Sequence, residues 1–266
     1  MSIITLLTDF GTEDEYVGLM KGVILTINPR ATIVDITHRI GSQDLTQAAF
    51  TIHASYRYFP AGSVHLVVVD PGVGTSRDLL ALEMRKHFFI APDNGILTLL
   101  LADDDYTSLV RLTNSDFFLK PVSKTFHGRD IFAPVGAYLS QGVEISKLGP
   151  EMDPNEAIRL ADLQARMLEN GEIIGKIIAI DHFGNLISNV EIRQLTRYSQ
   201  TGSLSSLKIQ IGSHVIHGLS ETYENVGSST PLALVGSRGY LEIAVNCGNA
   251  ARALKARRGD VVRVAI

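Results

Sequence analysis

The sequence predicts an α/β protein in two parts, an α/β part followed by a smaller part built from short antiparallel strands. Over roughly the first 160 residues, short apolar segments alternate with segments of helical periodicity. This alternation is typical of a parallel or mixed sheet that is covered on both faces. From Glu169 onward, short strands are separated by turns, which indicates a small antiparallel sheet or barrel. A chain of 266 residues is long enough for one large and one small domain.

The strands of the first part are predicted from short, mainly apolar segments. The segment IITLLT, residues 3–8, is typical of a strand buried on both faces. Two further strands of this kind are predicted at residues 31–36 and 63–69, and a hairpin at residues 79–84 and 87–91.

Helices are predicted between these strands. The first lies before Pro29, with acids in its first turn and apolar residues recurring at helical spacing, namely Tyr16, Leu19, Val23 and Ile27. Ser42 or Asp44 can cap the second helix, which continues to Tyr56. A short helix at residues 94–102 and a longer one at residues 129–142 complete this part.

We place the domains at residues 1–165 and 166–266, with the boundary inside Asp153 to Gly171, where residues 155–168 retain helical spacing. The second part contains one short helix at residues 249–256 and a hairpin that turns at Gly212-Ser213. Its remaining strands are expected within residues 171–181, 186–191, 231–237, 240–245 and 260–266.

Composition excludes several classes of protein. A net charge of -4 offers no basic surface for nucleic acid, and no apolar run is long enough to span a membrane. The N-terminus begins directly with a strand pattern and has no signal-peptide features, so we expect an uncleaved, cytoplasmic protein. Cys247 is the single cysteine, so an internal disulfide is excluded. The eight histidines show no spacing that indicates a metal site.

Three polar segments of the first part are candidates for a functional site. Asp9 and Asp70 each follow a predicted strand, where ligands of open α/β sheets bind; a structural role in a turn or a helix cap is the alternative. Arg77 follows Asp70 across a Pro-Gly-x-Gly turn. The two residues can form either a structural ion pair or part of a catalytic site. His127 stands just before a helix and is a reasonable general base, although a lone histidine is more often structural.

The second part has its own polar positions near strand ends. Asp181 and Asn185 enclose Phe183-Gly184, an arrangement that suits either a binding loop or an ordinary turn. Ser237-Arg238 can hold a ligand carboxylate, with a surface arginine as the alternative, and Asn246-Cys247 lies near the end of a later strand.

Taken together, six segments resemble one known family. TDFG at residues 8–11, VVDPGVG with Arg77, FHGRDIF, DHFGN, SRG and Asn246 occur in one order over essentially the whole chain. They resemble the S-adenosylmethionine hydrolase (adenosine-forming) family, which is related to S-adenosylmethionine-dependent chlorinases and fluorinases. The resemblance implies an N-terminal α/β domain with a mostly parallel central sheet and a smaller C-terminal antiparallel β-barrel domain. It also implies a homotrimer with sites between the N-terminal domain of one subunit and the C-terminal domain of the next.

The resemblance also implies roles for individual residues. The set that marks the hydroxide-using branch of the family matches Asp70, Arg77 and His127. Asp9 matches the aspartate that binds the ribose hydroxyls. The residues that hold the methionine part of the ligand match Asp181, Ser237 and Arg238. Those around the adenine match Phe183, Asn185, Asn246 and the backbone at Cys247.

The activity that the resemblance implies is hydrolysis of S-adenosyl-L-methionine to adenosine and L-methionine, without a metal or a cofactor. Attack by water on C5′ of the ribose requires a group that removes a proton, and His127, Arg77 and Asp70 are the expected set. Three alternatives stay open: transfer of the adenosyl group to a halide, binding of S-adenosylmethionine or adenosine without turnover, and metal-dependent hydrolysis.

Overall fold

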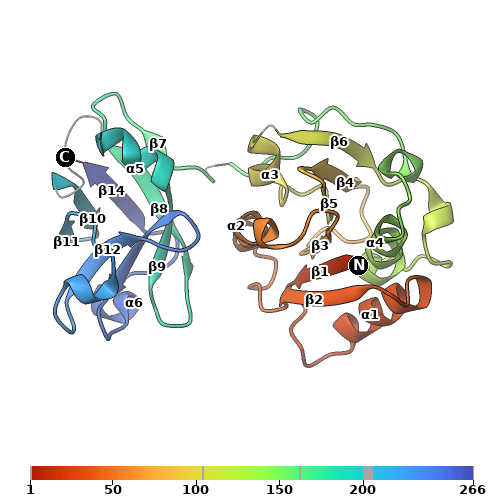
Figure 1. Cartoon of the computed structure of the whole chain (residues 1–266), viewed down its shortest axis with the longest axis horizontal. Coiled ribbons are helices and arrows are strands. Elements are labelled where there is room, and N and C mark those ends of the chain that lie inside the picture. The colour runs from red at the N-terminus through yellow and green to blue at the C-terminus, as the bar shows by residue number, and fades with distance from the viewer. Residues whose placement is uncertain (1, 104, 162, 200–205, 266) are drawn as a thin grey trace. The chain divides into compact units, whose positions relative to one another are not determined.

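A computed structural model describes residues 2–103, 105–161, 163–199 and 206–265. The chain divides into two compact units, Met1–Ala161 and Asp162–Ile266 (Figure 1). No helix among the described residues is both long enough and apolar enough to cross a membrane.

The first unit is an α/β unit around a six-stranded mixed sheet with the order β2-β1-β3-β5-β4-β6. The pairs β1–β2, β1–β3 and β3–β5 are parallel, whereas β4 pairs antiparallel with β5 and β6. The strands are β1 (Ile3–Thr8), β2 (Thr32–Thr37), β3 (Val64–Val68), β4 (Leu79–Met84), β5 (His87–Pro92) and β6 (Tyr106–Arg111). The sequence predicts the first five of these strands but not β6.

Helices cover both faces of this sheet because side chains of successive strand residues point to opposite sides. On β1, Ile4 and Leu6 pack with helices α1 and α4, whereas Leu7 packs on the opposite face with α2 and α3. The helices are α1 (Tyr16–Ile27), α2 (Leu45–Ser55), α3 (Thr98–Ala102) and α4 (Ala133–Ser140), with a π-helical turn at Gly128–Phe132 before α4. All four helices were expected, and Asp44 caps α2 by accepting a hydrogen bond from the Gln47 N–H.

Only part of the apolar stripe from which α1 is predicted packs on the core, namely Val23 and Ile27. Tyr16 and Leu19, two residues of the expected apolar stripe, are 43% and 41% exposed. The buried residues are Val17, Met20 and Ile24. Both stripes have helical spacing because this helix carries apolar residues on nearly all sides, so periodicity alone does not distinguish them.

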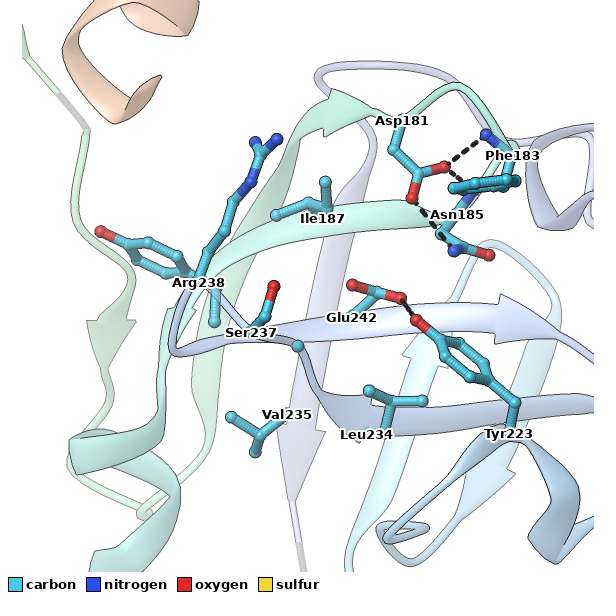
Figure 2. Close-up of a pocket in the computed structure, with 12 residues that line it drawn as sticks. Asp181, Phe183, Asn185, Ile187, Tyr223, Leu234, Val235, Ser237, Arg238 and Glu242 are labelled. Carbon is cyan, nitrogen blue, oxygen red and sulfur yellow. Dashed lines mark hydrogen bonds between the residues drawn. The ribbon is translucent and has the colours of Figure 1, made fainter. Parts of the chain in front are cut away.

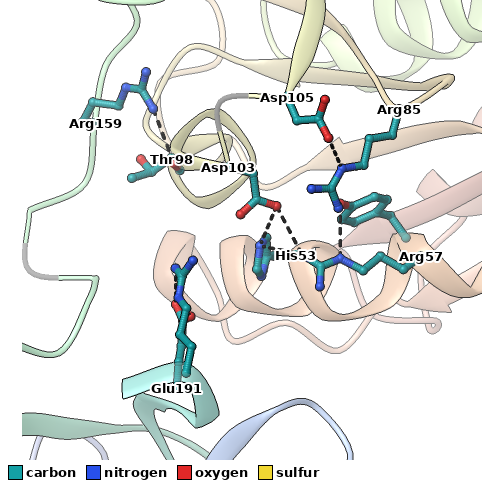
Figure 3. Close-up of polar contacts among 10 residues, drawn as sticks. His53, Arg57, Arg85, Thr98, Asp103, Asp105, Arg159 and Glu191 are labelled. Atoms are coloured by element: carbon teal, nitrogen blue, oxygen red, sulfur yellow. Dashed lines mark hydrogen bonds and ion pairs between the residues drawn. The ribbon is translucent and has the colours of Figure 1, made fainter. Parts of the chain in front are cut away.

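The helical spacing at residues 155–168 is also misleading, because no described residue of this segment is in an α-helix. Side chains of the first unit take up its backbone N–H groups instead. Asp93 Oδ1 accepts a hydrogen bond from the Ile158 N–H at 2.9 Å, and Thr98 Oγ1 accepts one from the Leu160 N–H at 2.9 Å. Figure 3 shows that Arg159 adds a further hydrogen bond to the carbonyl of Thr98. These hydrogen bonds anchor residues 158–160 to the first unit.

The second unit is a nearly closed, barrel-like sheet in which all paired strands are antiparallel, with the order β11-β10-β14-β8-β9-β13-β12. β7 pairs with β8 outside this order. The strands are β7 (Arg166–Met167), β8 (Ile173–Ile180), β9 (Leu186–Glu191), β10 (Lys208–Ile211), β11 (His214–His217), β12 (Pro231–Val235), β13 (Tyr240–Val245) and β14 (Val261–Ala265). The helices are α5 (Ile192–Ser199) and α6 (Ala250–Ala253). The sequence predicts these strands except β7, and it does not predict α5.

A cluster of polar contacts in the first unit lies near the C-terminal ends of α2 and α3 (Figure 3). Asp103 accepts a hydrogen bond from Arg57 at 3.1 Å and lies 3.3 Å from His53 Nε2. Arg85 pairs with Asp105 at 2.6 Å. The Arg57 and Arg85 side chains are about half exposed, so such pairs contribute little to stability.

His65 is a buried histidine at the centre of the sheet, on β3. Its Nδ1 lies 2.7 Å from Thr5 Oγ1, its Nε2 lies 3.2 Å from His87 Nδ1, and its ring stacks against Phe89. Burial, with a smaller contribution from His87, lowers the pKa of His65 to about 3. The folded protein therefore keeps this imidazole neutral, whereas in the unfolded chain it gains a proton below about pH 6.5.

We predict that His65 makes the fold less stable as the pH falls from about 6.5 toward 3, because only the unfolded state binds the proton in this window. His65→Asn keeps a polar atom near Thr5 but cannot titrate. Between pH 7.5 and pH 5, its free energy of unfolding should fall by roughly 1–2 kcal/mol less than that of the wild type, as measured by urea denaturation. The exposed His214→Asn is the matched control, and equal losses in all three proteins would contradict this role of His65.

Candidate active site

Two aspartates stand at the carboxyl ends of neighbouring parallel strands. Asp9 directly follows β1, and Asp70 lies two residues beyond the end of β3. Because Thr8 of β1 is aligned with Val68 of β3, both carboxylates reach the same edge of the sheet. This is the edge at which ligands of open α/β sheets bind.

A loop holds the Asp9 carboxylate. Asp9 Oδ2 accepts a hydrogen bond from the Gln43 N–H at 2.9 Å, and no described residue donates to Oδ1. Helix α1 begins only at Tyr16, and its N-cap residue is Glu15, so the alternative interpretation of Asp9 as the cap of this helix is wrong. One oxygen of Asp9 is thus fixed in place while the other remains available to a ligand.

Asp70 and Arg77 form a buried ion pair across the glycine turn. Arg77 Nε donates to Asp70 Oδ1 at 2.6 Å, and Arg77 Nη2 donates to Asp70 Oδ2. The two side chains are only 6% and 7% exposed. A bidentate pair of this kind fixes the plane of the guanidinium as well as its position.

His127 lies against the same guanidinium. Arg77 Nη2 is 3.1 Å from His127 Nδ1. A guanidinium only donates hydrogen bonds, so Nδ1 is the acceptor and the proton of the neutral imidazole resides on Nε2. The structure therefore brings Asp70, Arg77 and His127 together, although they come from two loops about 50 residues apart in the chain.

One atom of this cluster has no partner within the described part of the chain. Arg77 Nη1 is buried, and no described residue accepts its hydrogen bonds. An unsatisfied donor on a buried cation is unfavourable unless a water molecule or a ligand completes it. The guanidinium thus presents a preorganised donor for a small polar molecule.

Gly74 allows the two loops to approach. Its φ is +79°, a conformation that suits glycine, and a Cβ atom at this position would lie 2.2 Å from the Lys124 carbonyl oxygen. Any other residue would force apart the Asp70–Arg77 loop and the loop that leads to His127. The close approach of the two backbones therefore requires glycine at position 74.

A pocket of about 310 Å³ lies beside these groups in the first unit, and the buried Arg77 is not among its lining residues. Asp9, Asp70 and His127 all line it. Phe10 and Phe126 form an aromatic wall, with ring centroids 5.8 Å apart in an edge-to-face arrangement. The pocket thus combines two carboxylates, an imidazole and apolar ring surface.

The environment of His127 favours its neutral form. Burial lowers the pKa of His127, and the positive charge of Arg77 lowers it further, whereas Asp70 and Asp130 act in the opposite direction. The lowered pKa agrees with the hydrogen-bond geometry, in which Nδ1 must be free of a proton to accept from Arg77.

A second pocket, of about 440 Å³, lies in the second unit (Figure 2). Asp181, Phe183 and Asn185 line it at one end. Asp181 Oδ1 accepts hydrogen bonds from the Phe183 and Asn185 N–H groups, both at 2.9 Å, and Oδ2 accepts one from Asn185 Nδ2 at 3.1 Å. The loop is therefore an aspartate turn, as one interpretation of its sequence predicted, and it presents the 72% exposed ring of Phe183.

The same pocket is lined at its other end by Ser237 and Arg238, before β13 (Figure 2). Asn246 and Cys247 follow β13 and are not among its lining residues. Asn246 Nδ2 donates to the Val226 carbonyl at 2.8 Å, and Cys247 is exposed with φ +54°. The structure thus brings five of the seven expected positions of the second unit into one pocket and places the other two outside its lining.

Two further lining residues, Tyr223 and Glu242, were not expected from the sequence. The Tyr223 hydroxyl donates to Glu242 Oε1 at 2.7 Å. Glu242 is an acidic residue inside the otherwise apolar strand YLEIAV, and this local exception was the signal that sequence analysis passed over. Among the described residues, no group of three or more His, Cys, Asp or Glu side chains is arranged to hold a metal ion.

Comparison with known proteins identifies the family. The model of the SAM hydroxide adenosyltransferase N-terminal domain matches residues 4–149, and that of the C-terminal domain matches residues 175–263. The chain belongs to the SAM hydroxide adenosyltransferase family. Within this family it is 36% identical to the (R)-S-adenosyl-L-methionine hydrolase of Thermus thermophilus, over 97% of each chain. It is 35% identical to the enzyme of the same name from Salinispora tropica, over 98% of this chain and 97% of the other.

More distant members of the SAM hydroxide adenosyltransferase group and a solved structure complete the comparison. A protein named fluorinase, from Actinopolyspora mzabensis, is 28% identical over 98% of this chain and 96% of its own. A crystal structure of an uncharacterized conserved protein from Thermotoga maritima superposes with a TM-score of 0.91 at 33% identity, covering 99% of this chain and all of that one.

The contacts around His127 predict how its pKa responds to its neighbours. Arg77→Gln removes a positive charge and should raise the pKa of His127, whereas Asp70→Asn removes a negative charge and should lower it. Titration of the imidazole by NMR in the wild type and both variants measures the two shifts. Shifts in the same direction, or no shift in either variant, would contradict the contact geometry described above.

Proposed function

We propose that this protein hydrolyses S-adenosyl-L-methionine to adenosine and L-methionine. Support comes from the family membership, from the names of the curated relatives, and above all from the contact of Asp70, Arg77 and His127 at the edge of the sheet. A group that handles a proton is needed when water is the nucleophile, whereas a halide needs none. This set of residues therefore favours hydrolysis.

The reaction places simple demands on the protein. Oxygen of water attacks C5′ of the ribose, the C5′–S bond breaks, and its electron pair remains on sulfur. Methionine thus leaves as a neutral thioether, so no general acid is required and one proton is released from the water. The protein must align the water behind C5′, which is worth roughly 7–11 kcal/mol in favourable cases.

We assign the water to the free Nη1 of Arg77. The pair with Asp70 holds this guanidinium in one plane, so Nη1 donates in a fixed direction. Because Nδ1 of His127 already accepts from Arg77, its Nε2–H is a donor, which orients the lone pairs of the water. Each Asp70 oxygen retains a second lone pair, and we propose Asp70 as the group that takes the proton.

The remaining residues bind the substrate in this proposal. Asp9, with one oxygen free of described donors, binds the ribose hydroxyls. The methionine part is held by Asp181, Ser237 and Arg238, and the adenine by Phe183, Asn185, Asn246 and the backbone at Cys247. We propose a homotrimer in which the pocket of the first unit of one subunit and the pocket of the second unit of the next form one site, in a cytoplasmic enzyme that uses no metal.

We predict that the purified protein converts S-adenosyl-L-methionine to adenosine and L-methionine in equal amounts, also with saturating chloride and with EDTA. Chromatography of the products tests this directly. Mainly 5′-chloro-5′-deoxyadenosine in chloride would assign the protein to halide transfer. Activity lost to EDTA and restored by a divalent ion would require a metal. Binding of the substrate without any product would make the protein a sensor.

A further inference from the structure

Glu242 is a buried carboxylate that faces the pocket of the second unit. It stands on β13, is 8% exposed, and lies between Asp181 at one end of the pocket and Ser237 and Arg238 at the other (Figure 2). Neither the family resemblance nor the proposed binding roles assign a function to this residue. A carboxylate with so little contact with water requires compensation by hydrogen bonds or by a positive charge.

The surrounding residues fix the position of this carboxylate. The Tyr223 hydroxyl donates to Glu242 Oε1 at 2.7 Å. Glu242, together with burial, raises the pKa of Tyr223 to about 12, so the phenol remains a neutral donor. At Gly236 a Cβ atom would lie 2.5 Å from Glu242 Oε2, so glycine at this position makes room for the second oxygen. No described residue donates to Oε2.

The charged side chains that line this pocket include one more acid than base. Among its described lining residues, Asp181 and Glu242 are acidic and Arg238 is the single basic residue. S-Adenosylmethionine carries a sulfonium, an ammonium and a carboxylate, so its net charge is +1. One acid and one base of the pocket, Asp181 and Arg238, can balance the ammonium and the carboxylate of the ligand. Glu242 is thus the acid left to balance the sulfonium.

We propose that Glu242 is a specificity-determining residue that recognises the positively charged sulfur of the substrate through its free oxygen Oε2. This inference rests on the proposed function and extends it. A neutral thioether, such as S-adenosyl-L-homocysteine or methionine, offers no charge to this carboxylate. The pocket therefore favours the substrate over its thioether product and over S-adenosyl-L-homocysteine.

Recognition of the sulfonium has a definite kinetic signature. The charge on sulfur is greatest in the bound substrate and disappears as the C5′–S bond breaks, so Glu242 stabilises the ground state at least as much as the transition state. Removing it should raise KM without lowering kcat. A loss of general structural support would lower kcat as well.

The test compares Glu242→Gln with the wild type by two measurements, KM and kcat for S-adenosyl-L-methionine and the inhibition constant of S-adenosyl-L-homocysteine. Glutamine keeps the shape of the side chain and an oxygen that accepts from Tyr223. We expect KM to rise at least about tenfold, since the attraction between the carboxylate and the positive charge on sulfur is lost, while the inhibition constant stays within about threefold. Glu172→Gln, a partly exposed carboxylate paired with Arg263 elsewhere in the same unit, is the matched control and should change neither value.

Gly236→Ala provides a second variant that does not remove the charge. Its Cβ atom must displace Glu242 Oε2, so it should reduce the preference for the sulfonium in the same direction. Equal weakening of both ligands in the two variants, or an unchanged KM, would overturn the inference while leaving the hydrolase assignment intact. A wild-type protein that neither binds nor cleaves S-adenosyl-L-methionine would overturn both.

Discussion

The buried pair of Asp70 and Arg77 is the interaction on which the rest of the first unit's site depends. A guanidinium that is 7% exposed is tolerated only when its charge is balanced and most of its donors are satisfied. The Asp70 carboxylate balances the charge of Arg77 and accepts hydrogen bonds from its Nε and Nη2. His127 accepts a further hydrogen bond from Nη2. The remaining nitrogen, Nη1, is buried and has no hydrogen-bond partner among the described residues.

The fold explains why these residues meet. Parallel neighbours β1 and β3 bring Asp9 and Asp70 to one edge of the sheet, and the glycine turn returns the chain so that Arg77 faces Asp70. Close packing of Gly74 on the Lys124 carbonyl then brings the His127 loop alongside. In the second unit, the barrel-like sheet and its loops place Asp181, Arg238 and Glu242 along one pocket.

Sequence analysis succeeds where local chemistry decides the outcome. The mainly apolar strands β1 and β3, the hairpin of β4 and β5 and the cap at Asp44 all follow from short-range rules. It fails where tertiary contacts decide. Side chains of Asp93 and Thr98 accept hydrogen bonds from the Ile158 and Leu160 N–H groups, and no described residue of 155–168 forms the α-helix that the spacing favours. The buried side of α1 depends on which face meets the sheet, and the sequence offers two apolar stripes.

The candidate site likewise combines residues that the sequence identifies with geometry that only the fold reveals. Motifs identify Asp70, Arg77 and His127, but neither the bidentate geometry nor the tautomer of the imidazole is visible in the sequence. Glu242 escaped notice because an acid within a strand is usually solvent-exposed, and only the fold shows that it points into the pocket beside Tyr223.

The single-turnover rate constant of Arg77→Lys tests the central claim most directly. Lysine retains the positive charge beside Asp70 but lacks the planar fork and the directed Nη1 donor. If Arg77 orients the attacking water, the rate of C5′–S cleavage should fall by about 100-fold or more while the dissociation constant of S-adenosyl-L-methionine changes little. A rate constant within twofold of the wild-type value would show that a positive charge alone suffices and would contradict the account.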